Sequence, residues 1–534
     1  MFRSARPAAK ITPCRRCPVH LPPIRDNVNG PAPHSKGNTL ATLSLPAAVF
    51  KAYDIRGTVP EQLNPAFARG LGLALAQQAR AQNVPALVVG YDGRLSSPEL
   101  AQALQRGLLA GGVDTIDLGM VPTPLVYFAA HTQKTGSGVA ITGSHNPPNY
   151  NGFKMMMGGK TLHGEDVQAL RKVMEEMGGG WHPQGVPPQG SVLPQDPVLP
   201  QDPVLPQDPV PLQGSVPHGT RQTLGLIDAY IERVSTDVKL ARAMKIAIDC
   251  GNGVGGAVAP QLFAALGCKV DTLFCEVDGR FPNHHPDPAD PANLQDLIDH
   301  VKNSDCELGL AFDGDADRLG VVSKSGEIIW PDRQLILYAR DILQREPGST
   351  IIFDVKCSRH VARAIEQAGG RPLMWQTGHS MIKAKLAETG APLAGEMSGH
   401  IFFKERWFGF DDGLYTGARL LEILSRHADP SAVLEALPQG ISTPELKLEM
   451  REGEPHALIK RLQNEGKFPS AQSINPIDGV RAEYADGFGL ARASNTTPVV
   501  VLRFEGDTRE ALQRIQAEFR HALLALAPDA RLPF

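Results

Sequence analysis

The chain has 534 residues, too many for a single hydrophobic core, and this length predicts three or four domains. Its 53 Lys and Arg residues nearly balance its 57 Asp and Glu residues, and a net charge of −4 argues against a nucleic-acid-binding protein. No apolar run approaches the roughly 18 residues that a membrane-spanning helix needs. We therefore expect neither nucleic acid nor membrane among its partners.

Residues 1–45 are rich in Arg and Pro and lack the apolar region of a secretory signal. They contain Cys14 and Cys17 in a C-x-x-C pattern, but no second ligand pair with a spacing that fits zinc follows. We predict a disordered extension here. The remaining cysteines are scattered among apolar residues, which is typical of the buried, reduced thiols of a cytoplasmic protein: Cys250, Cys268, Cys275, Cys306 and Cys357.

A globular pattern begins at Phe50. Strands alternate with helical segments, as βαβ units with a mostly parallel sheet require. The expected elements are a strand over Val84–Gly90, a helix capped by Ser96 or Ser97 that continues through Leu109, and strands over Val113–Leu118 and Gly138–Thr142.

The composition changes abruptly between residues 179 and 219. Pro-Gln-Asp-Pro-Val-Leu recurs there with a six-residue period from Pro194 to Val210. Because so much proline disfavours both helices and central strands, we predict an extended linker that marks a domain boundary.

The α/β pattern then resumes and runs through two further cycles. The expected strands are Lys245–Asp249, Cys268–Cys275, Glu307–Phe312, Thr350–Val355 and Arg371–Trp375, and the expected helices are Ala257–Leu266, Asn293–Asn303, Gln334–Gln344 and Arg359–Gln367. From about Ser442 the order becomes mixed α+β and closes on an amphipathic helix over Thr508–Leu526.

These patterns predict an α/β protein of three similar α/β domains with mixed sheets and a smaller C-terminal α+β domain. The predicted segments are the extension 1–45, domain one at 46–178, the linker 179–219, domain two at 220–327, domain three at 328–439 and domain four at 440–534.

The first segment with recognisable chemistry is Thr142-Gly-Ser-His-Asn-Pro-Pro148, directly after a predicted strand. Ligand sites of doubly wound sheets lie beyond the carboxyl ends of strands. A lone serine in such a place is most often a turn residue. Here Ser144 precedes His145, and Lys154 follows ten residues later, so a base and a cation accompany a hydroxyl that could carry a phosphoryl group.

The second such segment is Asp313-Gly-Asp-Ala-Asp-Arg318, again at a strand end. The carboxylates of Asp313, Asp315 and Asp317 alternate in a loop of small residues and could converge on one hard cation such as Mg²⁺. An EF-hand is excluded because its twelfth position would be Lys324. A phosphatase with Asp313 as nucleophile also fits the pattern, but it would leave Ser144 without a role.

Three glycine-rich or polar segments complete the pattern. Asp249–Gly256 matches G-x-G-x-x-G, yet in one internal unit of several we interpret it as a tight turn and not as a dinucleotide site. Gly395–His400 offers two hydrogen-bond acceptors for sugar hydroxyls and a histidine that can act as donor or acceptor. Arg492–Pro498 offers a guanidinium, hydroxyls and backbone N–H groups for a phosphate.

With Tyr53-Asp-Ile-Arg56-Gly, these segments resemble the motifs of the α-D-phosphohexomutase superfamily, in the family's order, and most closely those of the bacterial phosphomannomutase/phosphoglucomutases. The similarity covers Phe50 to Phe534 except the Pro-rich insert. The resemblance implies four domains around a central cleft. It further implies interconversion of hexose 1-phosphate and hexose 6-phosphate through a phosphoserine and a hexose 1,6-bisphosphate intermediate, which also acts as activator.

The resemblance also implies roles for individual residues. Ser144 would be the carrier and would bind Mg²⁺ together with the three aspartates. The remaining catalytic candidates are His145, Lys154, Arg56, His379 and Arg318, with Arg56 acting mainly through its charge. The expected substrate-binding residues are Tyr53, Lys356, Glu396, Ser398, His400, Arg492, Ser494, Asn495 and Thr496.

The sequence departs from the family pattern at Tyr91, where many relatives carry Arg, and at Ala316, where many carry Gly. A methyl group at residue 316 requires either a negative φ or some strain. Two alternative functions stay open: a phosphoglucosamine mutase, which Met397 disfavours, and a catalytically silent sugar-phosphate-binding protein. We expect hexose phosphates as substrates, no obligate protein partner and a cytoplasmic location.

Overall fold

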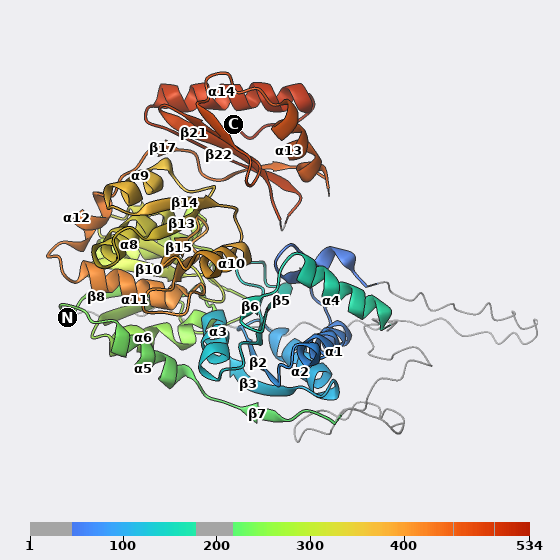
Figure 1. Cartoon of the computed structure of the whole chain (residues 1–534). Coiled ribbons are helices and arrows are strands. Elements are labelled where there is room, and N and C mark those ends of the chain that lie inside the picture. The colour runs from blue at the N-terminus through green and yellow to red at the C-terminus, as the bar shows by residue number, and fades with distance from the viewer. Residues whose placement is uncertain (1–44, 178–216, 452, 496) are drawn as a thin grey trace, which may run out of the picture. The chain divides into compact units, whose positions relative to one another are not determined.

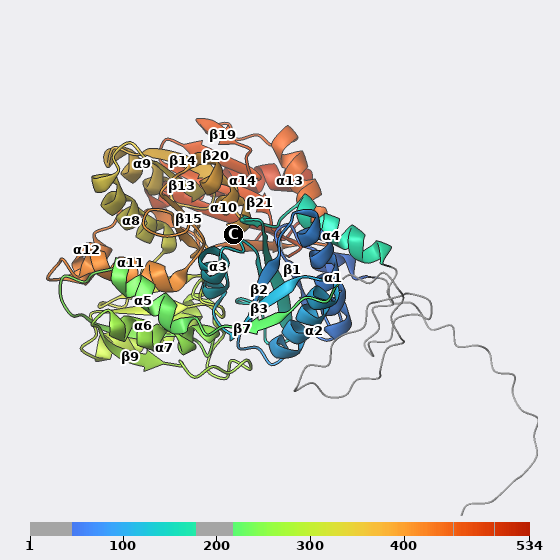
Figure 2. The same cartoon turned by 60° about the horizontal axis from the view of Figure 1, so that its bottom comes forward.

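The computed structural model describes residues 45–177, 217–451, 453–495 and 497–534. Cys14, Cys17, the Pro-rich repeat and Thr496 lie outside these ranges, so the interpretations made for them stay predictions. The described chain contains four sheets, each formed largely by one stretch of the sequence (Figures 1 and 2). Three carry parallel strands with helices and the fourth is antiparallel, which confirms the predicted fold class.

The first sheet has the order β1-β5-β4-β2-β3-β7, with β6 paired to β5. Strands β4, β2, β3 and β7 are parallel, whereas at the other edge β5 pairs antiparallel with both β4 and β1. Its strands are β1 (Ile55–Thr58), β2 (Ala86–Tyr91), β3 (Asp114–Met120), β4 (Gly138–Ile141), β5 (Tyr150–Met157), β6 (Lys160–Thr161) and β7 (Arg221–Thr223). Its helical segments are η1 (Ala47–Val49), α1 (Pro65–Ala81), α2 (Ser97–Ala110), α3 (Thr123–Thr132) and α4 (Glu165–Glu176).

Strand β7 lies just after the predicted boundary between the Pro-rich linker and domain two. It follows the Pro-rich segment in the sequence, but it pairs in parallel with β3 and so extends the first sheet. The exposed edge of β3 has backbone groups that need partners, and Arg221–Thr223 supplies them. The start of domain two at residue 220 stays a prediction, and β7 itself belongs to the first sheet.

The second sheet has the order β12-β11-β10-β8-β9, with β8, β9 and β10 parallel. Its strands are β8 (Lys245–Asp249), β9 (Lys269–Leu273), β10 (Leu308–Phe312), β11 (Leu319–Ser323) and β12 (Ile328–Ile329), and its helical segments are α5 (Ile227–Asp237), η2 (Val254–Ala257), α6 (Ala259–Ala265), η3 (Pro291–Leu294) and α7 (Gln295–Asn303). The helix predicted over Ala257–Leu266 instead begins after a short 3₁₀ segment, because Pro260 in its first turn has no N–H to donate.

The glycine-rich segment after β8 confirms the tight-turn interpretation. Gly251 has a φ of +50°, where a side chain would be strained. A Cβ on Gly256 would lie 2.0 Å from the carbonyl oxygen of Cys275. Both glycines are therefore explained by backbone geometry and close packing.

The third sheet has the order β14-β13-β15-β16. Its strands are β13 (Thr350–Asp354), β14 (Arg371–Trp375), β15 (Leu393–Gly395) and β16 (Ile401–Phe403), and its helices are α8 (Pro331–Arg345), α9 (Arg359–Gln367), α10 (His379–Thr389), α11 (Gly413–Leu424) and α12 (Pro430–Glu435). The predicted helix Arg359–Gln367 and the predicted strand Arg371–Trp375 are confirmed at both ends. Helix α11 packs against β10 and β11, so this part of the chain also covers the second sheet.

The fourth sheet is antiparallel, in the order β17-β22-β21-β20-β19 with β18 also paired to β22. Its elements are β17 (Ile441–Ser442), β18 (Leu446–Glu449), α13 (Glu454–Glu465), β19 (Ser473–Asn475), β20 (Val480–Tyr484), β21 (Gly487–Ala493), β22 (Val499–Gly506) and α14 (Arg509–Leu526). The side chain of Thr508 caps α14 by accepting the N–H of Ala511, and the helix predicted over Thr508–Leu526 is confirmed to within one residue.

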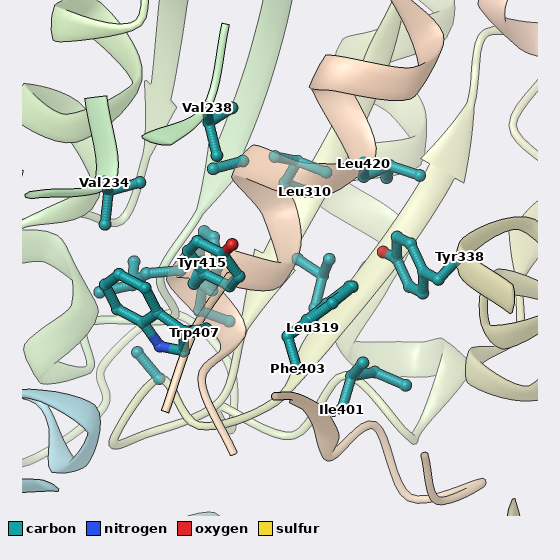
Figure 3. Close-up of a cluster of buried hydrophobic side chains, with 14 of the residues drawn as sticks. Val234, Val238, Leu310, Leu319, Tyr338, Ile401, Phe403, Trp407, Tyr415 and Leu420 are labelled. Atoms are coloured by element: carbon teal, nitrogen blue, oxygen red, sulfur yellow. The ribbon is translucent and has the colours of Figure 1, made fainter. Parts of the chain in front are cut away.

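The largest core joins the second and third sheets with α3 of the first domain. Its aromatic centre is shown in Figure 3, where Trp407 stacks on Tyr415 with ring centroids 4.2 Å apart. Tyr338 meets Phe403 edge to face at 5.2 Å. Separate apolar clusters lie under α1 and α2 and between the fourth sheet and α14. The second and third sheets therefore share one hydrophobic core although the sequence predicts two domains.

Candidate active site

The serine loop follows β4 and is held in shape by a buried arginine. Ser144 is itself buried, has a φ of +47°, and its N–H donates to Thr142 Oγ1 over 2.8 Å. The guanidinium of Arg94 donates to the carbonyl oxygens of Ser144 at 2.8 Å and of Asn146 at 2.6 Å. A left-handed conformation costs a non-glycine residue about 1–2 kcal/mol, and these bonds from Arg94 stabilise it.

The aspartate loop joins β10 to β11, and its three carboxylates are fully buried. One oxygen from each of Asp313, Asp315 and Asp317 lies within 4.8 Å of the others. Burial and the two neighbouring carboxylates raise the pKa of Asp313 well above its ordinary value. Ala316 has a φ of +57°, so of the two alternatives for this residue, a negative φ or backbone strain, the loop adopts the strained one.

The two loops meet directly. Ser144 Oγ lies 3.0 Å from Asp313 Oδ2 and 3.1 Å from His145 Nδ1. Burial and the charge of Arg318 lower the pKa of His145 well below its ordinary value, so its imidazole is neutral near pH 7. The hydroxyl of Ser144 therefore lies within hydrogen-bonding distance of an imidazole nitrogen and a carboxyl oxygen.

Lys154, on β5, places its ammonium group against the aspartate loop. Its Nζ lies 2.8 Å from Asp315 Oδ2 and also bonds Asp317 Oδ2. Burial alone would lower the pKa of Lys154, but Asp315 and Asp317 raise it well above its ordinary value. The lysine thus stays charged and offsets part of the negative charge of the loop.

The chemistry of this loop fits a divalent metal ion. The donors are carboxylate oxygens, which hard cations prefer. The Oδ1 atoms of Asp315 and Asp317 are buried without a hydrogen-bond partner in the described part of the chain. Buried carboxylate oxygens without partners are costly, and a cation between them would remove that cost.

Two residues that the sequence did not single out support these loops. Thr123, at the start of α3, donates from its hydroxyl to Asp315 Oδ2 over 2.6 Å. Arg94 lies three residues after Tyr91, and only Tyr91 was noted in the sequence, as a departure from the family pattern. Their positions after strands β3 and β2 are the signal that could have suggested them.

A second layer of the site contains the two predicted histidines. His400 Nε2 accepts from Arg318 Nε at 2.9 Å, and His400 Nδ1 lies 3.0 Å from Asp411 Oδ2. His379 stacks on His400 with ring centroids 5.5 Å apart. Burial and the charge of Lys383 lower the pKa of His379 well below its ordinary value. Asp411 is a further residue that the sequence analysis missed, although it adjoins Asp412, the cap of α11.

Tyr53 and Arg56, both from the first domain, contact His379 and the serine loop respectively. The ring of Tyr53 contacts His379 edge to face at 5.1 Å. Arg56 donates to Asn146 Oδ1 at 2.5 Å and to the carbonyl oxygen of Gly143 at 3.2 Å, so it is attached to the serine loop. Its guanidinium also pairs with Asp54.

The predicted sugar-binding loop lies between β15 and β16. Glu396 accepts the N–H of Gly378 at 2.6 Å through one oxygen and the hydroxyl of Ser398 at 2.9 Å through the other. Burial raises the pKa of Glu396. Lys356 is paired with Glu445, whose oxygen lies 3.0 Å from its Nζ. The charge of Lys356 is therefore shared with the fourth domain.

The predicted phosphate loop follows β21. Arg492 pairs with Asp478 at 2.9 Å, and the same carboxylate oxygen accepts the N–H of Thr377 in the third domain. The hydroxyl of Ser494 lies 3.1 Å from that of Thr497. With Asn495, this loop lines a pocket of ≈ 300 Å³ together with Ala47, Ala48, Phe50, Lys51 and Ala52. Arg492 is thus connected to the third domain rather than directly to the aspartate loop.

Comparison with known proteins identifies the class to which this arrangement belongs. Four family models match in order: the phosphoglucomutase/phosphomannomutase α/β/α domains I, II and III over residues 47–178, 227–326 and 330–440, and the C-terminal domain over 445–522. Together they cover well over half of the chain. The protein belongs to the phosphoglucomutase/phosphomannomutase family, which confirms the family resemblance of its sequence motifs.

Individual relatives extend over nearly the whole chain. A phosphomannomutase/phosphoglucomutase of Pseudomonas aeruginosa is 49% identical over 498 residues, which cover 93% of this chain and 100% of the relative. A phosphoglucomutase of Neisseria gonorrhoeae is 52% identical over 478 residues, or 89% and 97% of the two chains. The crystal structure of a family protein from Burkholderia thailandensis has a TM-score of 0.81 at 51% identity and covers 91% of this chain and 99% of its own.

A search of the described helices for a membrane span finds none of sufficient length and apolar character.

Proposed function

We propose that the protein is a phosphomannomutase/phosphoglucomutase, an isomerase that transfers a phosphoryl group between the 1- and 6-oxygens of a hexose. Family membership and relatives of about half-identical sequence support this activity. The observation that carries it is the meeting of Ser144 Oγ with Asp313 Oδ2, 3.0 Å apart, in a buried cluster of acids, a lysine and an arginine. Such a site positions one hydroxyl and stabilises a phosphoryl group upon it.

In the resting enzyme, Ser144 would carry the phosphoryl group. Asp313, Asp315 and Asp317 would hold Mg²⁺ beside it, and the bound ion would offset charge on the phosphoryl oxygens. Lys154 and Arg318 add positive charge from two sides of the same loop. This charge balance would allow a second, negatively charged phosphate to approach.

In the first transfer, a free hydroxyl of the hexose phosphate attacks phosphorus while the bond from Ser144 Oγ to phosphorus breaks. The hydroxyl proton would pass to a neutral imidazole, and His379 is kept neutral by its burial. The product is the hexose 1,6-bisphosphate. Ser144 Oγ takes up a proton as it leaves in the first transfer. In the second transfer, Ser144 Oγ attacks the other phosphoryl group while the bond from the sugar oxygen to that phosphorus breaks. The serine proton would pass to His145 Nδ1 or Asp313 Oδ2, and the departing sugar oxygen takes up a proton.

The remaining predicted residues would bind the substrate. Glu396 and Ser398 provide an acceptor pair for neighbouring sugar hydroxyls. Tyr53, Lys356 and His400 would contact the bound sugar phosphate. Arg492, Ser494, Asn495 and Thr496 would bind the phosphate that is not reacting, an assignment that rests on the family resemblance. The cytoplasmic location and the absence of an obligate protein partner remain predictions.

Mass spectrometry of the purified full-length protein tests the proposal. We expect one added phosphate on the peptide containing Ser144, and loss of that phosphate and of mutase activity in Ser144→Ala. Ser494→Ala, which keeps the serine loop intact, should retain the phosphate. If the wild type stays unphosphorylated after incubation with glucose 1,6-bisphosphate and Mg²⁺, the carrier role of Ser144 is wrong.

A substrate panel would assign specificity. Mannose, glucose and glucosamine phosphates should be compared at equal concentration, because the first two share the 3- and 4-hydroxyls that Glu396 and Ser398 would contact. Activity mainly on glucosamine phosphate would favour the phosphoglucosamine mutase alternative. A Ser144→Ala variant that preserved the cellular function would favour the silent sugar-phosphate-binding protein.

A further inference from the structure

A cluster of mixed donors lies in the second domain, away from the aspartate loop. Asp271 is on β9, His300 is in the last turn of α7, and Cys306 lies two residues before β10. Asp313 follows the opposite end of β10, so the five residues of that strand separate the cluster from the candidate active site. With a rise of about 3.3 Å per residue, the seven residues from Cys306 to Asp313 span roughly 23 Å along the chain.

The three side chains converge on one point. His300 Nε2 lies 3.0 Å from Asp271 Oδ2, and Cys306 Sγ lies 3.4 Å from the same oxygen. The ligand atoms of all three residues lie within 4.8 Å of one another. Three elements that are separate in the sequence thus present a sulfur, a nitrogen and an oxygen atom to one small volume.

These separations are close to those of a tetrahedral zinc site. Ligand bonds of about 2.0–2.3 Å at tetrahedral angles place the donor atoms roughly 3.3–3.6 Å apart. The two measured separations from Asp271 Oδ2 differ from that range by a few tenths of an ångström at most. Thiolate and imidazole ligands select zinc and similar metals over Mg²⁺. The donor set therefore differs in kind from the all-carboxylate loop at Asp313.

The accessibility of the cluster suits an ion that enters from solvent. The side chains of Asp271 and His300 are 30% and 35% exposed, whereas Cys306 is buried. Lys245 Nζ lies 3.4 Å from Asp271 and is also bonded to Asp305. Because Asp305 is a second partner, the ammonium group can leave Asp271 and stay paired when a cation arrives.

We propose that Asp271, His300 and Cys306 form a zinc-binding site with an open fourth position for water. Binding releases the thiol proton of Cys306 to solvent and requires the proton of His300 to reside on Nδ1, so that Nε2 offers its lone pair. The bound ion links β9, α7 and the start of β10 and stabilises the second domain. This site is independent of the mutase reaction.

Titration of the full-length protein, first freed of transition metals, with Zn²⁺ and Co²⁺ tests this site. Saturating Mg²⁺ is present throughout so that the aspartate loop is occupied. We expect one Zn²⁺ to bind per chain in competition with a chromophoric chelator, and Co²⁺ to produce a near-ultraviolet thiolate-to-metal band. Cys306→Ser should abolish the band. His300→Gln should weaken Zn²⁺ binding at least about 10-fold, because removal of a residue that only supports a metal ligand already lowers metal affinity about 10–100-fold.

Cys268→Ser is the matched control, because Cys268 is a buried thiol of the same domain outside the cluster. It should retain both the band and the affinity. Unfolding in the presence of a chelator shows whether the variants remain folded, and Zn²⁺ should then raise the unfolding midpoint of the wild type and Cys268→Ser but not of Cys306→Ser. Absence of the thiolate band in the wild type, or its persistence in Cys306→Ser, would overturn the proposal.

Discussion

Lys154→Met removes an ammonium group from between two buried carboxylates of the aspartate loop. The Lys154 side chain is 3% exposed, and its Nζ lies 2.8 Å from Asp315 Oδ2 and also contacts Asp317. Breaking a buried ion pair costs about 3–5 kcal/mol because the remaining charge is left uncompensated. The two contacts share one ammonium group, so we expect a total loss of about 4 kcal/mol in the free energy of unfolding without metal.

Mg²⁺ should reduce this loss. Lys154 and a divalent ion are attracted by the same carboxylates, so the variant should bind Mg²⁺ more tightly than the wild type. A ligand at 100 times its Kd stabilises the folded state by about 2.7 kcal/mol, and each tenfold gain in affinity adds about 1.4 kcal/mol. Activity should nevertheless fall about 10²–10³-fold in kcat, as when one electrostatic contact to a transition state is removed.

The assay is chemical denaturation of the wild type and the variant with Mg²⁺ and with a chelator. Lys383→Met is the control, because Lys383 is also buried and pairs with Asp411, at 2.9 Å, outside the aspartate loop. Its loss of stability should not depend on Mg²⁺. If Mg²⁺ stabilises Lys154→Met no more than the wild type and Lys383→Met, the reasoning about competition for the carboxylates is refuted.

Three further predictions concern single side chains. Ala316→Gly should leave stability unchanged or raise it by up to about 1 kcal/mol in urea unfolding, because relief of the +57° φ offsets the greater freedom of glycine in the unfolded chain; a larger loss would show that packing of the methyl group dominates. Thr123→Val should weaken Mg²⁺ binding about 10–100-fold by calorimetry, because it removes the 2.6 Å bond to Asp315; unchanged affinity would contradict that role. Burial raises the pKa of Asp412 from 3.8 to about 7, so the folded state holds a proton that the unfolded state releases, and stability should fall by about 3 kcal/mol as pH rises from about 4 to 7. Asp412→Asn keeps an acceptor for the Tyr415 N–H and should flatten this part of the stability profile; an unchanged slope would assign it to other groups.

The sequence by itself determined the fold class and the family, and it singled out the serine and aspartate loops as the candidate site. These features are local: strand and helix periodicity, a serine followed by histidine after a buried strand, and three aspartates at alternate positions after another. Parallel strands deliver their carboxyl ends to one edge of a sheet, so the local pattern also indicates where the loops lie. The predicted strand Lys245–Asp249 is confirmed at both ends because its apolar pattern is also a local feature of the sequence.

Only the tertiary structure decided which distant side chains meet. Thr123 and Asp315 are 192 residues apart and bond directly, and Asp411 reaches His400 from a different loop. Strand β7 completes the first sheet from beyond the Pro-rich segment, and Asp271, His300 and Cys306 converge from three elements. Such contacts depend on strand order, helix docking and burial, which arise from the packing of the whole chain, whereas local patterning depends on the backbone and side-chain preferences of a few neighbouring residues.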